Sequence, residues 1–540
     1  SQVPLVPGPT IRFLDSIEER IVDGRGSSAL ADVLARSGIG YVVVRRDLDL
    51  FASDAPSTSH VDRAIANSDG LVEVAGFGTT GIGAQSAITV YRVQRDVPRV
   101  EAVSSDAVRT LRGGPEDLIT ALEAGSLAAR EPVLVQVADA TGAAPDLVAD
   151  GYRLRERQFG RLRDSLSQMM TASESYRNKR RAHDYPGVDG AVRVAAAYPD
   201  IRALSASSSS GYADTLGPVR PELGPYSAVD GVPETYWRSA PLESPKGQWL
   251  EVDLKEPQPL PYLDVTAGVD GFSGLPVRRI RVDAGGQVSE HAVDPATGVV
   301  RVPLSGAPVA KVRVTVLATF GDPEYGVVAI REIGFPGLEL GRSMVVPSDG
   351  ADGSTSFVFR AQPEQRACVV GELGLDCDGE TAAPAEESSG LNRTFRTGTA
   401  GTWTIGGTVT ARSSPSTAAL LLPLGGQVSA VASSVLTDDP QVSGQFAVDQ
   451  DPRTAWVSAR GGQDQTLELR WKGRRPLSRL RVVPAGGATA APTRAILEAG
   501  GERREIDLGA RSLGFFDPLS TDHVKITFPG DGGSRSLGIA

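Results

Sequence analysis

The sequence has few of the residues on which much enzyme chemistry depends. Among its 540 residues there are only two cysteines and four histidines. The histidines lie far apart and none has metal-ligand spacing, so a zinc centre is not predicted. No HExxH, GxSxG or Walker sequence occurs, and there is no cysteine–histidine nucleophile arrangement. The sequence therefore predicts no catalytic residues.

Long apolar runs and an excess of basic residues are also missing. The apolar runs fall far short of the roughly 20 residues needed to cross a bilayer, and a formal net charge of −11 argues against binding nucleic acid. Only six of the 55 basic residues are lysine, a bias typical of GC-rich coding that suggests an actinobacterial source. There is no initiator methionine and no signal peptide, and the last residues stop inside an apolar run. We therefore expect a soluble part of a longer protein.

Turn residues and short β-patterned segments are abundant. The length predicts about three to five domains, and 61 Gly with 37 Pro indicate many turns. We predict a multidomain, mainly β fold. The exception is a small α/β domain over residues 1–150, where helical and strand spacing alternate. Helices are expected at 11–21, 28–35 (capped by Ser28) and 116–124, and strands at 41–44 (buried), 88–93 and 133–137.

An arginine-rich connecting segment follows at residues 151–194. Its part from 153 to 181 carries eight Arg and one Lys against three acidic residues. One interpretation is a solvated connection whose arginines pair with the acidic domains around it. The other is a surface that faces anionic lipid or phosphorylated glycan. The sequence leaves both open.

An internal repeat indicates two copies of one domain. The segment Ala-Val-Asp-Gly-Val-Pro-Glu-Thr-Tyr-Trp at 228–237 matches Ala-Val-Asp-Gln-Asp-Pro-Arg-Thr-Ala-Trp at 447–456, and flanking strand-like segments match in the same order. So long a repeat indicates duplicated domains rather than a solenoid. We place antiparallel β-sandwiches at 195–340 and 426–540, the second truncated at its last strand, and a β-rich unit at 341–425.

The two cysteines, Cys368 and Cys377, lie in this middle unit, in a polar and Gly-rich stretch. A disulfide between them that pins a surface β-loop fits an extracytoplasmic compartment. Two unpaired thiols are the alternative.

Two further motifs are weak. Gly76-Phe-Gly-Thr-Thr-Gly81 fits the dinucleotide pattern GxGxxG, but the strand expected at 88–93 leaves no room for the required helix, so we interpret it as a hairpin loop. Asp438-Asp439 is an adjacent carboxylate pair in a loop, which suits a cation at least as well as acid–base catalysis.

The strongest site signal is the repeated motif Ala-Val-Asp-x-x-Pro-x-Thr-x-Trp. Asp and Thr oxygens beside backbone carbonyls suit a hard cation such as Ca²⁺, and the Trp can anchor the loop in the core. The motif resembles the discoidin family (coagulation factor V/VIII type C, F5/8 type C), widespread as carbohydrate-binding modules. The resemblance covers 195–340 and 426–540. It implies discoidin-like jelly-roll sandwiches with a structural calcium and sugar-binding loops at one end.

Carried over residue by residue, this resemblance implies two sets of site residues. Trp237 and Trp456 are expected inside the sandwiches. In the second copy Gln450 replaces the glycine and the closing Glu is missing, so that site is incomplete. The implied calcium ligands are Asp230, Gly231, Val232, Thr235 and Glu332 in the first copy, and Asp449 and Thr454 in the second. The implied sugar contacts are the loop aromatics Tyr212, Tyr226, Phe272, Phe320 and Tyr325, although such rings are as often packing as binding.

A second resemblance covers nearly the whole chain. It rests on the duplicated sandwiches and on the segments at 7–15, 40–46, 155–161 and 391–395. Together these resemble the large membrane α-(1→3)-arabinofuranosyltransferases of mycobacterial and related cell-wall synthesis. That resemblance implies a membrane-embedded GT-C half that uses a lipid-linked donor, and an extracytoplasmic half with carbohydrate-binding modules.

We therefore predict the extracytoplasmic (periplasmic) glycan-binding portion of a cell-wall arabinofuranosyltransferase, active in arabinogalactan or lipoarabinomannan synthesis. Its expected partners are arabinan or arabinogalactan and the membrane-embedded half of the same polypeptide. It would position the acceptor rather than perform transfer. The alternative is a secreted adhesion or scaffold protein with protein-binding sandwiches. A glycoside hydrolase would require paired catalytic carboxylates in residues 1–190, which we do not identify.

Overall fold

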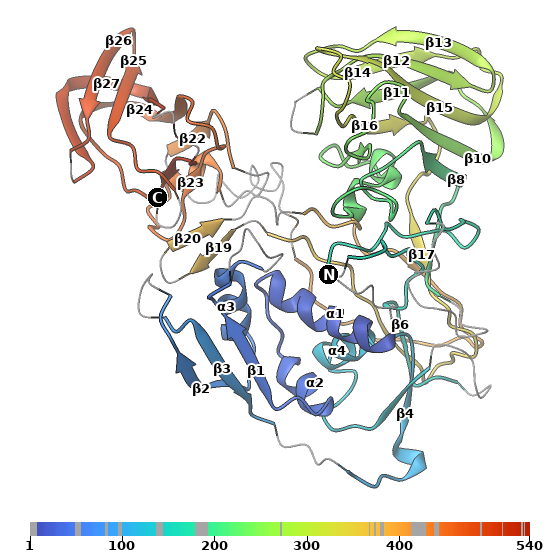
Figure 1. Cartoon of the computed structure of the whole chain (residues 1–540). Coiled ribbons are helices and arrows are strands. Elements are labelled where there is room, and N and C mark those ends of the chain that lie inside the picture. The colour runs from blue at the N-terminus through green and yellow to red at the C-terminus, as the bar shows by residue number, and fades with distance from the viewer. Residues whose placement is uncertain are drawn as a thin grey trace.

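A computed structural model describes the chain from residue 8 to 540, apart from 49–55, 81–84, 96–99, 137–143, 162, 179–192, 270–272, 367, 372–373, 378–382, 411, 413–427, 437–441, 486–488, 510, 531–532 and 534. Within this part the protein is mainly β, and its α-helices lie in the N-terminal region (Figure 1). The predicted fold class is confirmed. No helix in the described part is both long and apolar enough to cross a bilayer.

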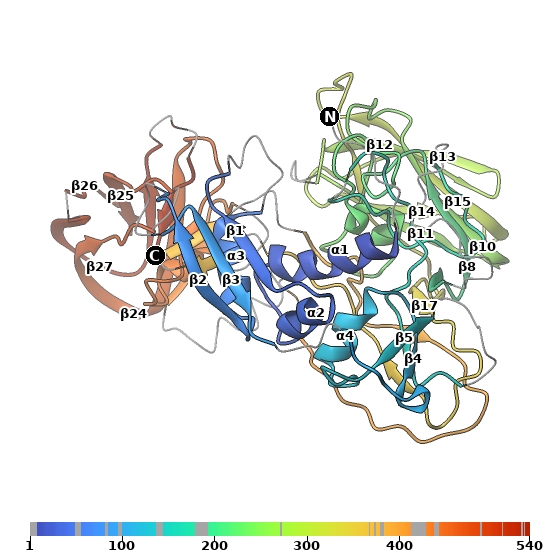
Figure 2. The same ribbon diagram turned by 60° about the horizontal axis from the view of Figure 1, so that its bottom comes forward.

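The N-terminal region begins with three helices on one face of a small sheet (Figures 1 and 2). Buried Ile17, Leu30 and Leu34 of the helices pack with Val93 and Val42 of the sheet. The sheet is antiparallel with strand order β1-β3-β2. The elements are α1 (Pro9–Val22), α2 (Leu30–Arg36), α3 (Thr58–Ala66), β1 (Tyr41–Arg45), β2 (Leu71–Phe77) and β3 (Ile88–Val93).

Two local predictions in this region are wrong. Ser28 does not cap α2, because Ala29 occupies the N-cap position and its N–H bonds to the hydroxyl of Ser27 at 3.1 Å. The strand predicted at 41–44 forms, but it is not buried on both faces, since Tyr41 and Val43 are exposed. The Gly-rich segment at 76 continues β2, which pairs antiparallel with β3 as expected for a hairpin; residues 81–84 lie outside the described part.

A second sheet joins segments that are far apart in sequence. Its strands are parallel in the order β18-β6-β4-β5, and α4 (Asp117–Glu123) packs beside them. The middle segment 341–425 therefore does not stand apart, because its strand β18 completes this N-terminal sheet. A small third sheet has the order β21-β17-β7. The strands are β4 (Arg109–Arg112), β5 (Val133–Gln136), β6 (Leu147–Ala149), β7 (Ala195–Ala197), β17 (Ser343–Val345), β18 (Ser356–Val358) and β21 (Arg393–Thr394).

The first predicted sandwich is a pair of antiparallel sheets around one apolar core that contains the fully buried Trp237. Its strand orders are β13-β12-β15-β10-β8 and β14-β11-β16-β9. The strands are β8 (Ile201–Ala206), β9 (Trp237–Arg238), β10 (Trp249–Pro259), β11 (Tyr262–Ala267), β12 (Val277–Ala284), β13 (Gln287–Ala292), β14 (Val299–Pro303), β15 (Pro308–Thr319) and β16 (Ala329–Gly334).

The second sandwich repeats this topology. Its larger sheet, β22-β24-β27-β25-β26, corresponds strand by strand to β8-β10-β15-β12-β13. Ile539 pairs with the fully buried Trp456 as Ile330 pairs with Trp237. The strands are β22 (Val428–Ala432), β23 (Trp456–Val457), β24 (Gln465–Arg481), β25 (Arg494–Ala499), β26 (Glu502–Asp507), β27 (Leu513–Phe528) and β28 (Gly538–Ile539).

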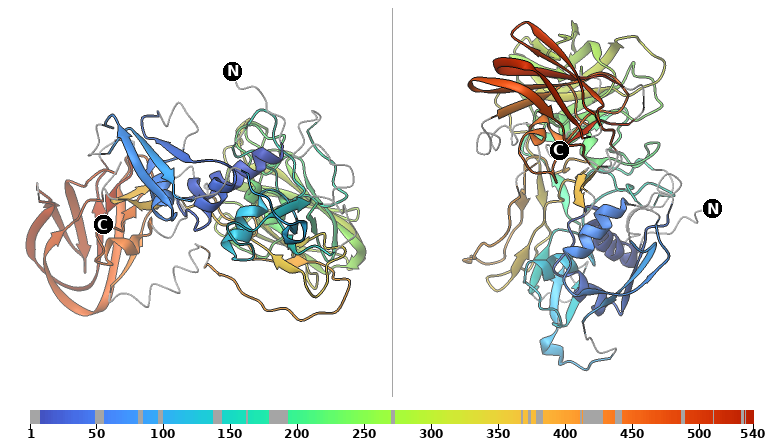
Figure 3. Two further views of the ribbon diagram at one scale, coloured as in Figure 1. Left: turned by 90° about the horizontal axis from the view of Figure 1, so that it is seen from below. Right: turned by 90° about the vertical axis from the view of Figure 1, so that its left-hand side faces the viewer.

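A hairpin lies between the N-terminal region and the second sandwich. Its strands are β19 (Cys368–Gly371) and β20 (Gly374–Cys377), and the register places Cys368 opposite Cys377. Cys368 is disulfide-bonded, and it packs with Val442 and Val457 of the second sandwich. The two sandwiches lie apart, on either side of the N-terminal region (Figures 1 and 3).

Candidate functional site

A pocket of about 350 Å³ lies where the N-terminal helices meet the arginine-rich segment and the middle segment. Its wall is built by α1, by the start of α4, and by residues 150–157, 163–166, 219–222, 360–366 and 383–386. The volume is at the lower end of the range of about 300–1,000 Å³ that is typical of small-ligand sites. The pocket therefore has room for a small ligand or for one end of a larger one.

Ionisable side chains of both signs line this pocket. The lining residues include nine arginines and nine carboxylic acids. No aromatic ring is among the described residues of the wall. A ligand here would be held by hydrogen bonds to charged groups rather than by stacking on a ring.

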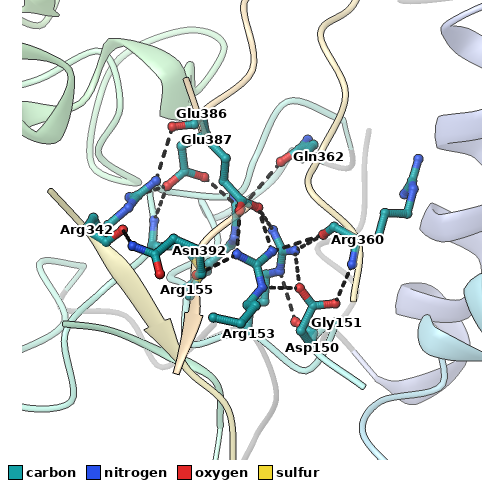
Figure 4. A network of polar contacts seen from close by, with 12 residues as sticks. Asp150, Gly151, Arg153, Arg155, Arg342, Arg360, Gln362, Glu386, Glu387 and Asn392 are labelled. Carbon is teal, nitrogen blue, oxygen red and sulfur yellow. Dashed lines mark hydrogen bonds and ion pairs between the residues drawn. The ribbon is translucent and has the colours of Figure 1, made fainter. Parts of the chain in front are cut away.

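The inner wall, which includes Glu386, is backed by a buried ion-pair network around Glu386 and Glu387 (Figure 4). Glu386 is 2.7 Å from Arg155 and 2.8 Å from Arg342, and it also accepts the backbone N–H of Met169 at 2.8 Å. Burial alone would raise the pKa of Glu386, but Arg155 and Arg342 outweigh it and lower the pKa below the ordinary value. Glu386 is therefore an ionised acceptor at neutral pH.

The adjacent Glu387 ties the same network to the N-terminal sheet. It is 3.0 Å from Arg153 and 2.6 Å from Arg393, and both arginines also contact Asp150 at the end of β6. Asp150 further accepts the backbone N–H of Arg360 at 3.0 Å (Figure 4). Each arginine in this wall is thus fixed by two or more acceptors, so its remaining N–H groups point in set directions.

Helix α1 forms the opposite side of the pocket. Glu19 is 3.2 Å from Arg360, and Asp15 is 2.7 Å from Arg157 of the arginine-rich segment. Glu18, which is half-exposed, lies 3.5 Å from Arg163. Partial burial raises the pKa of Glu18 despite Arg163. Glu18 is therefore the acid of this side that is open to solvent and less firmly paired.

Asp117 lies at the floor, where α4 begins. It is buried and accepts the backbone N–H groups of Gly114 and Gly151, both at 2.8 Å. Burial, with Glu116 and Asp150 nearby, raises its pKa well above the ordinary value. This residue links α4 to the start of the arginine-rich segment.

These contacts favour the first interpretation for the described arginines of the segment, whereas residues 179–192 lie outside the described part. Arg153, Arg155 and Arg157 are mostly buried and each is paired with a carboxylate. They form the predicted pairs, although inside the protein rather than on a solvated connection. Because acids are as numerous as arginines in the pocket wall, a bound phosphate would lie close to carboxyl groups as well as to guanidinium groups. Hydroxyl groups, which both donate and accept hydrogen bonds, match such a wall better.

The predicted calcium loop of the first sandwich is ordered around Asp230. Its carboxylate accepts the hydroxyl of Thr235 at 2.9 Å and the backbone N–H of Val232 at 2.9 Å. Gly231, between them, has a φ of +74°, a conformation that side chains with a Cβ disfavour. Ser388 of the middle segment also donates to Asp230. The loop is thus held by a side chain from outside the sandwich.

Glu332 of β16 faces this loop, as predicted. Burial and the nearby Asp230 raise the pKa of Glu332 to about 7, although the backbone N–H of Gly231 opposes the shift. Its Oε2 is buried and makes no hydrogen bond among the described residues. Two facing carboxylates with an unsatisfied oxygen fit a bound cation. The described residues contain no group of three or more His, Cys, Asp or Glu arranged around a metal position, so backbone carbonyls would have to complete the shell.

The second copy forms the same loop around Asp449. Asp449 accepts the hydroxyl of Thr454 at 2.6 Å and the backbone N–H of Asp451 at 2.9 Å. Gln450 takes the left-handed conformation of Gly231, with a φ of +68°. The motif therefore builds the same turn in both copies.

The predicted sugar-binding aromatics fall into three groups. Tyr212 and Tyr226 are buried and covered by arginines, since the guanidinium of Arg177 lies 4.1 Å from one ring centroid and that of Arg342 lies 4.0 Å from the other. Neither ring is open to a sugar, so these two predictions are wrong. Phe320 and Tyr325 are exposed in the loop between β15 and β16. Phe272 lies outside the described residues.

Sequence reasoning missed the pocket itself. Its main residues, Asp150, Arg153, Arg155 and Glu386, come from three segments that the sequence separates by up to 236 positions. One signal was available, because Arg-Leu-Arg-Glu-Arg at 153–157 places its arginines at alternate positions, as on one side of an extended chain.

Comparison with known proteins finds relatives that match most of the chain. Residues 1–183 match the family model described as "Alpha-(1->3)-arabinofuranosyltransferase, N-terminal GT-C domain". An α-(1→3)-arabinofuranosyltransferase of Mycolicibacterium smegmatis is 32% identical over 558 residues, which cover 94% of this chain. The chain is homologous to the α-(1→3)-arabinofuranosyltransferases. The resemblance that the sequence motifs indicated is thereby confirmed, while the discoidin resemblance stays a prediction.

Further relatives agree with this arabinofuranosyltransferase homology. The Mycobacterium tuberculosis α-(1→3)-arabinofuranosyltransferase is 28% identical over 97% of the chain. The cryo-EM structure of arabinofuranosyltransferase AftD from Mycobacteria superposes on all of the chain with a TM-score of 0.83 and 25% identity. The chain spans less than half of these proteins, namely 38% and 40% of the curated relatives and 45% of the solved chain.

Proposed function

We propose that this chain is the extracytoplasmic, glycan-binding portion of a cell-wall arabinofuranosyltransferase. We further propose that the pocket between α1 and the Glu386 wall holds acceptor arabinan. The observation that carries the proposal is the composition of the pocket, which nine arginines and nine carboxylic acids line together. The homology with transferases does not favour a secreted adhesion or scaffold protein.

The chemistry of the wall suits a neutral furanose. Glu386, Glu387 and Asp150 fix the arginines that they contact, so the wall presents donors and acceptors in set positions. Sugar hydroxyls are well hydrated in water, so each new hydrogen bond yields little net free energy. We expect a dissociation constant on the order of 10–1,000 µM, or roughly 4–7 kcal/mol.

Weak binding suits this role in a polymerising enzyme. A site that positions a growing acceptor must release it between additions. Further contacts on the same chain, such as the exposed Phe320 and Tyr325 of the first sandwich, would raise the affinity for a long polymer through avidity. Transfer itself would belong to the membrane-embedded half of the polypeptide, and we expect the chain alone to transfer no arabinose.

We also propose that Ca²⁺ binds between Asp230 and Glu332. The support is the buried, unsatisfied Oε2 of Glu332 and its position beside Asp230, since burial and then the charge of Asp230 raise the pKa of Glu332. Bound there, calcium would neutralise the two facing acids and hold the loop against β16. Its role would be structural.

Titration calorimetry with arabinofuranosyl oligosaccharides tests the glycan proposal. Two variants change groups that line the pocket, Glu18→Ala and Gln362→Ala. The matched control is Glu290→Ala, since Glu290 is a half-exposed acid paired with Arg281 at 2.9 Å on the surface of the first sandwich. We expect the pocket variants to weaken binding at least fivefold and the control to change it less than twofold.

Three outcomes would contradict the proposal. If the wild-type protein gives no heat of binding at millimolar oligosaccharide, the role of the chain would be structural rather than glycan-binding. Binding that Tyr325→Ala removes, while Glu18→Ala leaves it unchanged, would move the site to the sandwich loop. Inorganic phosphate that binds more tightly than the oligosaccharide would show that the pocket selects anions.

A further inference from the structure

The sheet β1-β3-β2 has one covered face and one open face. The helices α1 and α2 pack on the first face through Val42, Leu71 and Val93. Large apolar side chains lie on the other. The exposed fractions are 60% for Tyr41, 57% for Val43, 39% for Val72, 48% for Val74 and 58% for Phe77.

The register places these side chains in rows that cross all three strands. The cross-strand rows on the open face are Tyr41–Arg92–Val72, Val43–Val90–Ala75 and Arg45–Ile88–Phe77. Because partners in register point to the same face, the apolar groups form one continuous surface. Val74 lies at the irregularity between Glu73 and Ala75 and adds to it.

Such an apolar surface is unusual on a sheet face that is exposed to solvent. When one face of an antiparallel sheet is exposed to solvent, its strands normally alternate apolar and polar residues, and the polar residues point to the solvent. In β1 the sequence Tyr-Val-Val-Val-Arg is instead apolar at four consecutive positions, a pattern typical of strands covered on both faces. Contiguous apolar surface of this kind on a protein marks a contact site.

The relatives of the chain indicate which part of the polypeptide packs on this open face. The sheet lies within residues 1–183, the part that matches an N-terminal GT-C domain. The same chain spans only 38% of the Mycolicibacterium smegmatis protein. The relative therefore contains segments that residues 1–540 do not, and a sheet is normally covered by elements of its own domain.

We propose that the open face of β1-β3-β2 is the interface through which this chain packs against the rest of the GT-C domain of the same polypeptide. The occupant is an apolar protein surface of that domain. Arg92 lies at one end of the face, where the occupant would supply an acceptor. The inference uses the proposed function only in taking the chain as part of a transferase, and it is independent of glycan binding.

Thiol accessibility tests this proposal. The chain has two native cysteines, and Cys368 is disulfide-bonded, so Val43→Cys introduces a distinct reactive group. The matched control is Val288→Cys on β13 of the first sandwich, where Val288 is 58% exposed. In residues 1–540 alone, a maleimide should react with both introduced thiols at rates within about threefold. In the detergent-solubilised full-length transferase, the thiol at position 43 should react at least tenfold more slowly, while the control thiol keeps its rate.

Each other outcome overturns the proposal. Equal reactivity of the two thiols in the full-length protein would show that the face stays open. Protection of position 43 in lipid nanodiscs but not in detergent would identify lipid as the cover. Protection in the isolated chain that grows with protein concentration would identify a second copy. If the Val43→Cys substitution lowers the melting temperature, the labelling experiment is repeated with Val74→Cys, which lies on the same face. Loss of glycan binding would leave the labelling result unchanged, so the two proposals fail separately.

Discussion

The hydroxyl of Ser388 donates a hydrogen bond to Asp230, although the two residues are 158 positions apart. Ser388 follows directly on Glu386 and Glu387, which hold the arginines of the pocket wall. Its other neighbour, Ser389, is 3.1 Å from the hydroxyl of Tyr226. One short loop of the middle segment therefore contacts both the pocket and the calcium loop of the first sandwich.

The first prediction concerns calcium at this loop. Ca²⁺ should raise the melting temperature of the wild type at pH 8, because it binds only the folded state, and ligand at 100 times its dissociation constant adds about 2.7 kcal/mol. Glu332→Gln should remove the effect, since Glu332 is the acid with the unsatisfied oxygen. The control Asp449→Asn changes the corresponding loop of the second copy, which is separate from Glu332, and should leave the calcium shift unchanged. Differential scanning fluorimetry with calcium and with chelator measures the shift. Absence of any calcium shift in wild type would refute the site.

The second prediction compares a buried and an exposed ion pair. Glu386→Gln leaves Arg155 and Arg342 buried without their carboxylate, and breaking such a pair costs about 3–5 kcal/mol. Glu290→Gln breaks the exposed pair with Arg281 and should cost less than about 1 kcal/mol. Urea denaturation measures both losses. Similar losses for the two variants would show that the wall is accessible to water.

The third prediction concerns pH and Glu174. Burial raises the pKa of Glu174 from 4.5 to about 7, although the backbone N–H of Thr171 and the charge of Arg177 oppose it. The folded state therefore holds a proton that the unfolded state has lost, and the free energy of unfolding falls as pH rises from about 4.5 to 7. Glu174→Gln should flatten this part of the profile and stabilise the protein at pH 8 by on the order of 1–2 kcal/mol. Thermal unfolding between pH 4 and 8 supplies the profile, and a variant whose slope matches wild type would contradict the assignment.

The fourth prediction uses the duplicated turn. Gly231 and Gln450 both have left-handed backbone conformations, which cost a residue with a Cβ roughly 1–2 kcal/mol. Gly231→Gln should therefore destabilise the protein by about that amount, and no atom lies within 4 Å of a Cβ added there, so the cost is conformational. Gln450→Gly should be neutral or stabilising by up to about 1 kcal/mol, since glycine also loses more backbone entropy on folding. Chemical denaturation measures both, and stabilisation by Gly231→Gln would be the contrary result.

The sequence allowed the sandwiches to be predicted because local patterns determine them. The repeat around Asp230 and Asp449 marked the two domains, and their five-stranded sheets have the same strand order. In the N-terminal region, the spacing of apolar residues was also sufficient to predict α1 and β3. In these elements the periodicity of apolar residues and the packed face agree.

The pocket could not be predicted because it is made of long-range contacts. Arg153 meets Glu387, and Arg342 covers the ring of Tyr226, in each case across more than 100 positions. Nothing in the local sequence of Tyr226 indicates that an arginine will cover it, so the ring was taken as exposed. The prediction of a buried strand at 41–44 was wrong for a different reason. Its apolar pattern was interpreted correctly, but only one of the two faces has a cover within residues 1–540.

The parallel pairing of β18 with β6 sets an order for folding during synthesis. Phe357 of β18 pairs with Val148 of β6. The N-terminal sheet therefore cannot be completed until the ribosome has synthesised β18, about 200 residues after β6. The first sandwich lies between the two strands, and its sheets need no residue beyond 334. Because domains fold as they emerge, this sandwich can fold before the N-terminal sheet closes. A nascent chain that is stopped between the two strands would therefore contain a folded first sandwich and an incomplete N-terminal sheet. The edge of β6 that later pairs with β18 would still be accessible to chaperones.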